Sequence, residues 1–236
     1  MKHRRLVFAL CLCLLWGCME PPFWAYYDAE SFVVGYVDCE GWRDTSDNPH
    51  NMSLGLKYDN HLSLRHNDDV TYYKYDSKGE AKEKYEELCI KNGDTSYNKE
   101  DRLRPEWDNT SGKYTSYVYV QNFVAIDVVS NRDFDENHPA GTSLADIVKY
   151  SCHSYWGFVS GGYKDFDSTY YLSGYLNEMP EEGLRLITVS WPIILQFPPI
   201  PPTAEGVHTL TVTLTTDEGE IITVKTKRVW KPEVEE

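Results

Sequence analysis

The sequence predicts a mainly β protein with one or two short helices. Several stretches alternate apolar and polar residues with a period of two, which is typical of strands with one buried face. One stretch, residues 78–91, instead repeats its apolar residues at the spacing of a helix. The 236 residues include 18 Tyr and 7 Trp, and a chain this rich in aromatic residues has enough apolar surface to fold.

The first 17 residues have the pattern of a secretory signal peptide. A basic start precedes the apolar run Leu6–Leu15, and the small residue Gly17 stands at the expected cleavage point. The apolar run is too short to span a bilayer, which takes about 20 residues. We therefore expect residues 1–17 to be removed after export.

The junction Leu15-Trp16-Gly17-Cys18 resembles a bacterial lipobox. Leu15, Gly17 and Cys18 fit that pattern, whereas Trp16 is unusual at its position. The resemblance implies that Cys18 receives a diacylglyceryl thioether and becomes the first residue of the mature chain. The alternative is an ordinary signal peptide followed by an incidental cysteine. Met19 stands where Asp retains lipoproteins in the inner membrane of some bacteria, so the expected location is the outer membrane, with the leaflet left open.

Residues 18–30 form the expected tether between the lipid anchor and the folded part. Pro21-Pro22 keeps such a segment extended. Residues 31–236 are long enough to bury a core, and we predict that they form a single domain. The proline-rich run at residues 197–202 is expected to cross from one sheet to another as an extended segment.

The formal net charge of −14 at pH 7 limits the partners of the protein. A chain this acidic is repelled by phosphate backbones, so nucleic-acid binding is not expected. The same charge opposes binding to anionic lipid head groups. We therefore expect membrane attachment to come from the acyl chains on Cys18 and not from a basic patch.

Three cysteines remain in the folded part once the signal peptide and the lipid-bearing residue are set aside: Cys39, Cys89 and Cys152. A disulfide is permitted outside the cytoplasm, and an odd count leaves at least one thiol unpaired. One disulfide among these residues and no disulfide are equally compatible with the sequence. Their spacing matches no zinc motif, and no cofactor is predicted.

Strands are predicted in the segments 31–37, 52–58, 70–75, 114–129 and 184–197. The segment 114–129 is apolar on both of its alternating faces, which indicates a central strand between two layers. Residues 157–174 mix Tyr, Trp, Phe, Ser and Gly. They fit either an irregular strand pair, which we prefer, or an aromatic recognition loop.

Two short helices are predicted. Ser77 with Glu80 forms a capping-box pattern at the start of residues 78–91, where apolar residues recur three and four positions apart. A similar pattern that begins at Ser143 predicts a second helix over residues 143–150.

The segment before the second predicted helix carries a resemblance to a known family. It has the form Asp-x-Asp-x-x-His-Pro-Ala-Gly-x-Ser-Leu-x-Asp, and its fixed positions are Asp133, Asp135, His138, Pro139, Ala140, Gly141, Ser143, Leu144 and Asp146. Together with the lipobox and the β-rich C-terminal part, it resembles a family of Bacteroidota lipoproteins with a domain of unknown function. The resemblance implies a location and a fold but no activity.

The same segment opens like a calcium-binding loop, because Asp133, Asp135 and Asn137 alternate. An EF-hand has Gly at its sixth position and Glu at its twelfth, whereas this chain has His138 and Leu144 there. Turn formation and capping by these side chains are the favoured alternative, so no metal site is predicted.

The C-terminal part has the most regular pattern. Leu210, Val212 and Leu214 alternate with threonines, Asp217-Glu218-Gly219 supplies a turn, and residues 221–229 return. This predicts a hairpin with one buried and one solvated face. It resembles the terminal strand pair of immunoglobulin-like or fibronectin-like domains, although the Cys…Trp…Cys spacing of true immunoglobulin domains is missing. The resemblance implies an immunoglobulin/fibronectin-like β-sandwich.

The sequence contains no nucleophile elbow, no zinc-protease motif and no nucleotide-binding glycine loop. We therefore expect a non-catalytic lipoprotein of the cell envelope that binds a protein or a glycan partner. The alternatives are a structural or assembly component of the outer membrane and a hydrolase whose carboxylates match no motif. Exposed tryptophans in a row would favour glycan binding, and the candidates are Trp42, Trp107 and Trp156.

Overall fold

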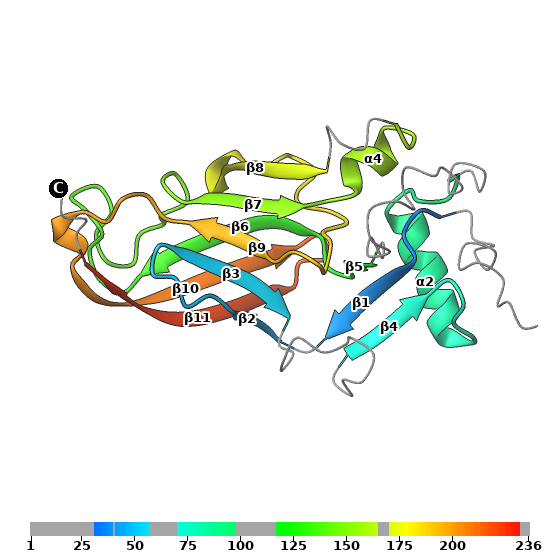
Figure 1. The fold of residues 1–236 in the computed structure, drawn as a ribbon, viewed down its shortest axis with the longest axis horizontal. Coiled ribbons are helices and arrows are strands. Elements are labelled where there is room, and N and C mark those ends of the chain that lie inside the picture. The colour runs from blue at the N-terminus through cyan, green and yellow to red at the C-terminus, as the bar shows by residue number, and fades with distance from the viewer. Residues whose placement is uncertain (1–30, 40, 57–69, 98–116, 165–169, 232–236) are drawn as a thin grey trace, which may run out of the picture. The chain divides into compact units, whose positions relative to one another are not determined.

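Three sheets make up the described part of the protein (Figure 1). The computed structural model describes residues 31–39, 41–56, 70–97, 117–164 and 170–231. These residues belong to one compact unit. The predicted mainly β fold is confirmed, and α-helix within the described residues is limited to α2 (Glu80–Lys91) and α4 (Trp156–Ser160). The signal peptide, Cys18 and the tether lie outside the described residues.

The five-stranded sheet has the order β2-β3-β9-β7-β8, and all of its neighbouring strands are antiparallel. Its strands are β2 (Trp42–Asp44), β3 (Asn51–Leu56), β7 (Lys149–His153), β8 (Tyr171–Tyr175) and β9 (Ile193–Gln196). Met52, Leu54 and Leu56 of β3 are buried at alternate positions, as expected for a strand with one face on a core. Because β9 lies between β3 and β7, segments far apart in the sequence become neighbours in this sheet.

The C-terminal hairpin and one earlier strand form a three-stranded sheet with the order β11-β10-β6. Its strands are β6 (Phe123–Ser130), β10 (Gly206–Thr216) and β11 (Ile221–Trp230). Leu210, Val212 and Leu214 are fully buried, and the threonines between them are partly exposed. Gly219 supplies the turn with a φ of 84°, a conformation that other residues rarely adopt. The predicted hairpin is confirmed.

The remaining sheet has three strands in the order β4-β1-β5. Its strands are β1 (Gly35–Cys39), β4 (Val70–Lys74) and β5 (Tyr117–Tyr119). The β1–β4 pair is antiparallel, and the β1–β5 pair is parallel. Two 3-10 turns, η3 (Leu176–Glu178) and η4 (Pro202–Ala204), complete the regular elements of the described residues. The proline-rich run ends in η4.

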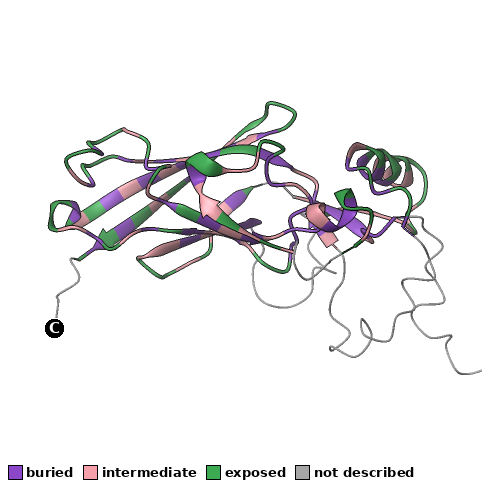
Figure 2. Ribbon diagram, turned by 90° about the horizontal axis from the view of Figure 1, so that it is seen from above, coloured by how far each residue is buried: buried purple, intermediate pink, exposed green. Residues whose placement is uncertain are grey.

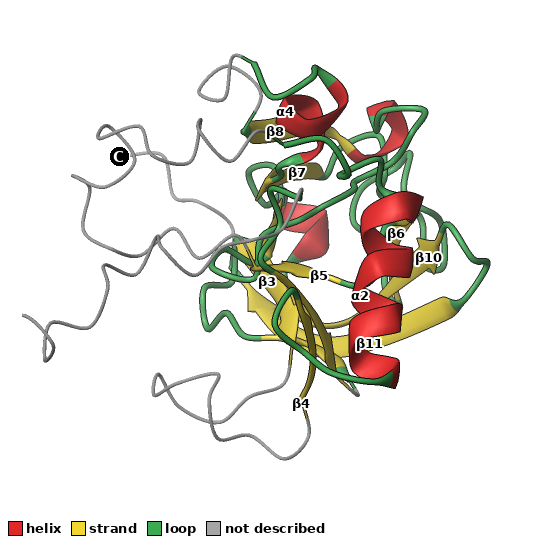
Figure 3. Ribbon diagram, turned by 90° about the vertical axis from the view of Figure 1, so that its right-hand side faces the viewer, coloured by secondary structure: helices red, strands yellow, loops and turns green. Residues whose placement is uncertain are grey.

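Helix α2 is confirmed, but its predicted capping box is wrong. The helix begins after Gly79, whose φ is 58°, and no side chain caps it. The Ser77 hydroxyl instead accepts a hydrogen bond of 3.1 Å from the backbone N–H of Lys74. Figure 3 shows α2 as the longest helix. No helix among the described residues combines the length and the apolar composition that crossing a membrane requires.

One hydrophobic cluster draws on both the five-stranded sheet and the β11-β10-β6 sheet. Its members include Met52, Leu54, Ile193, Leu195, Ile126, Val128, Leu210, Val212 and Leu214. Figure 2 shows buried and more exposed residues alternating along the strands. Burying a Leu or Ile side chain stabilises a fold by about 1.5–3 kcal/mol, so this cluster is the main apolar contribution to the described fold.

The long central strand predicted over residues 114–129 is wrong. Strand β5 ends at Tyr119 and β6 begins at Phe123, and β6 lies at an edge of its sheet. Asn122 lies in the break and is buried. Its side-chain amide donates to Asp217 at 3.0 Å and its oxygen accepts the N–H of Leu186 at 3.3 Å. These side-chain bonds hold the chain in a turn where the apolar pattern predicted a continuous strand.

The helix predicted over residues 143–150 is also wrong. Ser143 forms an isolated bridge with Val129, and its hydroxyl donates to Asp127 at 2.5 Å. The same hydroxyl accepts the N–H of Ala145 at 3.1 Å. The polar side chain therefore forms a turn instead of a helix cap, and β7 begins by Lys149.

Candidate functional site

The structure does not place the predicted tryptophans in an exposed row. Trp42 is only 8% exposed, and its ring centroid lies 4.7 Å from that of Tyr119 in the core. Trp42 therefore does not meet the condition of exposure on which its candidacy as a binding residue depended. Trp156 is partly buried, and the Arg185 guanidinium lies 4.5 Å from the centre of its ring. Trp107 lies outside the described residues.

A different set of aromatic side chains lies side by side on the five-stranded sheet. His153 ends β7, Tyr171 begins β8 as its direct partner across the strands, and Trp191 lies just before β9. The ring centroid of His153 is 5.7 Å from that of Tyr171 and 5.0 Å from that of Trp191. We call these three residues the aromatic row. Tyr171 and Trp191 are 58% and 52% exposed, and they are the only aromatic members of the exposed large apolar residues described.

The aromatic row is anchored to the interior by further rings. Tyr170 lies 4.5 Å from His153 and stacks on the buried Tyr155 at 5.3 Å, centroid to centroid. Tyr155 in turn packs edge to face on Phe32 at 5.0 Å. The backbone N–H of Thr188 also donates to the carbonyl of His153 at 2.9 Å. Contacts of this kind restrict the rings, so the aromatic row is presented on a rigid support.

His153 occupies the centre of the aromatic row as an uncharged ring. Burial lowers the pKa of His153 below its ordinary value, which is about 6.5, so the imidazole is neutral at neutral pH. Its Nδ1 is buried without a hydrogen-bond partner among the described residues. Nε2 makes no hydrogen bond within the described residues.

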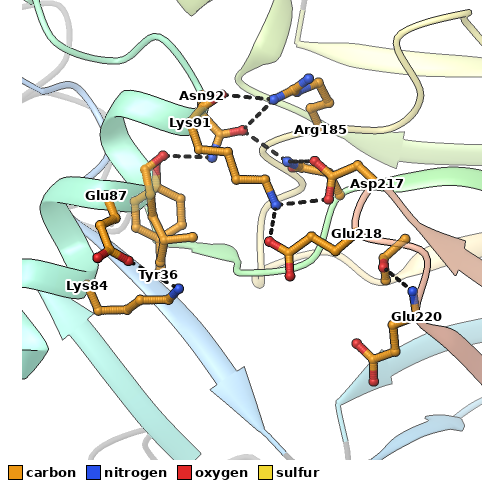
Figure 4. A network of polar contacts seen from close by, with 12 residues as sticks. Tyr36, Lys84, Glu87, Lys91, Asn92, Arg185, Asp217, Glu218 and Glu220 are labelled. Atoms are coloured by element: carbon orange, nitrogen blue, oxygen red, sulfur yellow. Dashed lines mark hydrogen bonds and ion pairs between the residues drawn. The ribbon is translucent and has the colours of Figure 1, made fainter.

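A polar network fixes the segment that leads to Trp191 (Figure 4). Arg185 donates from Nη2 to the carbonyl of Lys91 at 3.1 Å and to Oδ1 of Asn92 at 3.3 Å. The Lys91 ammonium group bonds Asp217 at 2.9 Å and Glu218 at 2.7 Å. The network thus ties the C-terminal end of α2 to the β10–β11 turn and to the segment that delivers Trp191.

Residues 133–146 form a loop in which several polar side chains bond to the loop itself. Asp133 accepts the N–H of Ala140 at 2.7 Å, and Asp135 accepts the N–H of His138 at 2.9 Å. The His138 ring lies between two carboxylates, with Nδ1 at 2.7 Å from Asp135 and Nε2 at 3.1 Å from Asp146. These carboxylates therefore stabilise turns of the loop by accepting backbone hydrogen bonds. Among the described residues, no group of three or more His, Cys, Asp or Glu side chains is placed to hold a metal ion.

The described cysteines are buried thiols. Cys89 and Cys152 are free, so no disulfide joins them. Burial raises the pKa of Cys152 to about 12, and burial together with the charge of Asp94 raises the pKa of Cys89 to about 11. Both are therefore protonated at neutral pH, a form that neither attacks substrates nor binds metals well. The side chain of Cys39 lies outside the described residues.

The aromatic row was not predicted, although part of its signal is local. Tyr171 falls within the aromatic segment 157–174, which contains most of α4 and the start of β8. Trp191 directly precedes Pro192, within the predicted strand 184–197. His153 stands among polar residues and gives no local signal. Only the pairing of β8, β7 and β9 brings the three together.

The aromatic row combines exposed rings, a rigid support and an uncharged centre. Comparison of the chain with family models, curated proteins and solved structures finds no match.

Proposed function

We propose that this protein is a lipid-anchored, non-catalytic protein of the cell envelope that binds a glycan partner through the aromatic row. The exposure of Tyr171 and Trp191 on either side of His153 is the main support. Large aromatic rings contribute most to stability when they are buried. Two neighbouring aromatic rings that remain about half exposed therefore indicate a surface that binds a partner.

The location in this proposal rests on the N-terminal sequence. The apolar run before Cys18 and the lipobox-like junction support export and acylation, and Met19 supports the outer membrane. The resemblance to Bacteroidota lipoproteins agrees with the same location. The absence of catalysis in the proposal is supported by the protonated state of the two buried thiols, Cys89 and Cys152.

We also propose that the β-rich body is an immunoglobulin/fibronectin-like sandwich, with the five-stranded sheet and the β11-β10-β6 sheet as its layers. Their shared hydrophobic cluster supports this arrangement. So does Arg228 of β11, whose guanidinium bonds the Asp44 carboxylate at the end of β2 and the carbonyl of Ser46 at 3.0 Å. In such a fold, one face of each sheet is buried and loops or sheet edges remain available for partners.

The proposal is tested with the full chain, purified in detergent, and the polysaccharide fraction isolated from the envelope of the producing cells. We expect retention of the protein on this fraction after immobilisation. Trp191→Ala with Tyr171→Ala should abolish retention, and Ile221→Ala, which truncates a residue exposed to 67% on another sheet, should not. Retention that is unaffected by the double variant would refute the proposed site. Retention that is lost after protease treatment of the fraction would identify a protein partner instead.

The anchor is tested separately at Cys18. Because the thioether needs the thiol, Cys18→Ser should block acylation and release the protein from the membrane fraction. Mass spectrometry of the N-terminal peptide checks this expectation. An acylated Cys18→Ser protein would contradict it.

A further inference from the structure

We propose that the aromatic row binds a single uncharged saccharide chain laid across strands β8, β7 and β9. This inference rests on the proposed function and adds the chemical class of the ligand. It depends on the spacing of the rings, on their polar tips, on their charge and on the size of the surface.

The spacing of the rings favours an oligosaccharide over a single sugar. Adjacent strands of a sheet lie about 4.7–4.9 Å apart, and the centroids of Tyr171 and Trp191 lie 5.7 Å and 5.0 Å from that of His153. With Tyr171 on β8, His153 on β7 and Trp191 just before β9, the three rings therefore cover roughly 10 Å, which is longer than one sugar ring. The planes of Tyr171 and Trp191 are inclined by 74° and 53° to the imidazole. Because the three rings are not coplanar, they suit a chain whose successive sugars can tilt.

The chemistry of the side chains matches that of a sugar. An aromatic face carries partial negative charge, and the C–H hydrogens on one face of a pyranose carry partial positive charge. Each ring of the aromatic row also has a polar edge, namely the indole N–H of Trp191, the hydroxyl of Tyr171 and Nε2 of His153. Those groups can donate to or accept from sugar hydroxyls while the ring faces stack.

Electrostatics favours an uncharged chain. The aromatic row contains no charged side chain at neutral pH, because burial keeps His153 in its neutral form. The whole chain carries a formal charge of −14. Long-range repulsion therefore opposes an anionic polysaccharide, and no cation in the aromatic row compensates for it.

The size of the surface favours a small ligand over a folded protein. Tyr171 and Trp191 each offer at most about 150–250 Å², whereas a stable protein interface takes roughly 800 Å² from each partner. The other exposed large apolar residues described lie on different elements: Ile90, Val124, Val207, Ile221 and Val229. Nothing among them extends the aromatic row toward the area that a protein partner requires.

Isothermal titration of the detergent-purified full chain tests the inference. The uncharged probes are maltohexaose, cellohexaose, laminarihexaose and chitohexaose, and oligogalacturonate is the anionic probe. We expect at least one uncharged probe to bind and oligogalacturonate not to bind. Stacking of a nucleobase on one aromatic side chain is worth roughly tenfold to hundredfold in affinity, and we expect a similar factor for the C–H face of a sugar. Trp191→Ala or Tyr171→Ala should therefore weaken binding by that factor, whereas Trp191→Phe should retain most of it and Ile221→Ala all of it.

The possible results separate this inference from the function on which it rests. Retention on the envelope polysaccharide that depends on Trp191, with no binding of the four uncharged probes, would overturn the uncharged class and leave the binding function intact. Preferential binding of oligogalacturonate would overturn it in the same way. If the double variant of Trp191 and Tyr171 changes neither retention nor titration, both proposals fail. A normal denaturant midpoint for each variant shows that a loss of binding is not a loss of folding.

Discussion

The C-terminal hairpin and the aromatic row are both built on antiparallel strands, but their large apolar side chains meet different surroundings. In the hairpin, Leu210 and Leu214 have no exposed surface. In the aromatic row, Tyr171 and Trp191 keep more than half of theirs. The hairpin side chains thus contribute to the core, whereas the rings lie at a surface on which the core does not depend.

Because of this difference, effects on folding and effects on binding can be separated by substitutions in the two regions. A substitution in the hairpin should lower the free energy of unfolding and affect binding only through the loss of folded protein. A substitution in the aromatic row should weaken binding and change the free energy of unfolding only slightly. The loss of stability should therefore be larger for the buried contacts than for the aromatic row.

The largest loss is expected when Arg228 is replaced. Its guanidinium bonds the carboxylate of Asp44, and their side chains are only 8% and 3% exposed. Removal of one partner leaves a buried charge without its counterion, which typically costs about 3–5 kcal/mol. Arg228→Met should therefore lower the free energy of unfolding in urea by that amount. The neighbouring Lys227 is exposed, and Lys227→Met should change it by less than about 0.5 kcal/mol. Equal losses of stability for the two variants would contradict a stabilising role of the Arg228–Asp44 ion pair.

A loss almost as large is expected for Leu214→Ala. The side chain is fully buried in the cluster shared by two sheets. Truncation of a buried Leu costs about 2–5 kcal/mol, depending on how far the cavity collapses. Thr213→Ser on the other face of β10 is the control and should cost well under about 1 kcal/mol. A larger loss for Thr213→Ser than for Leu214→Ala in thermal melts would mean that the threonine face of β10, and not the leucine face, is buried.

A smaller, pH-dependent effect is expected at His138. Burial alone would lower the pKa of His138, but hydrogen bonds and the charges of Asp135 and Asp146 outweigh burial and raise it above the ordinary value. The folded state therefore favours the imidazolium. This stabilisation is complete below the unfolded pKa of about 6.5, and it is lost as the pH rises through the higher folded pKa.

The measurement is the difference in free energy of unfolding between the wild type and His138→Gln across the neutral range. This difference should shrink as the pH rises. The other histidines are present in both proteins, so their titration cancels. Two curves that run parallel would show that His138 does not titrate with folding.

The smallest effect on stability is expected in the aromatic row. Trp191 is 52% exposed and packs on His153, so Trp191→Ala should lower the free energy of unfolding by only about 0.5–1.5 kcal/mol. Chemical denaturation with the same protein used for binding checks this value. A loss comparable to that of Leu214→Ala would mean that the ring is structural and would remove the contrast between the two regions.

The parts of the fold that could be predicted depend on neighbours in the sequence. Leu210, Val212 and Leu214 alternate along one strand, so their shared face could be inferred without knowledge of a partner. The features that could not be predicted depend on distant partners. The side-chain amide of Asn122 donates to Asp217 and ends a strand that its own neighbours favour.

The candidate site shows the same limit. Trp42 begins strand β2 and Trp191 lies just before β9, and the sequence alone gives no means of telling which of them is buried. Trp42 packs on Tyr119 of a different sheet, whereas Trp191 lies at the surface beside His153. The order of strands β8, β7 and β9 decides the site, and that order is a property of the fold and not of local periodicity.

Contact between Trp191 and the ligand is measured most directly by the indole N–H signal of this residue in a proton–nitrogen correlation spectrum. Trp191→Phe assigns the signal by its disappearance. Addition of the uncharged hexasaccharide that binds best should shift the Trp191 signal in a saturable way and leave the indole signal of the buried Trp42 unchanged. A saturable shift at other residues with no change at Trp191 would contradict contact between Trp191 and the ligand.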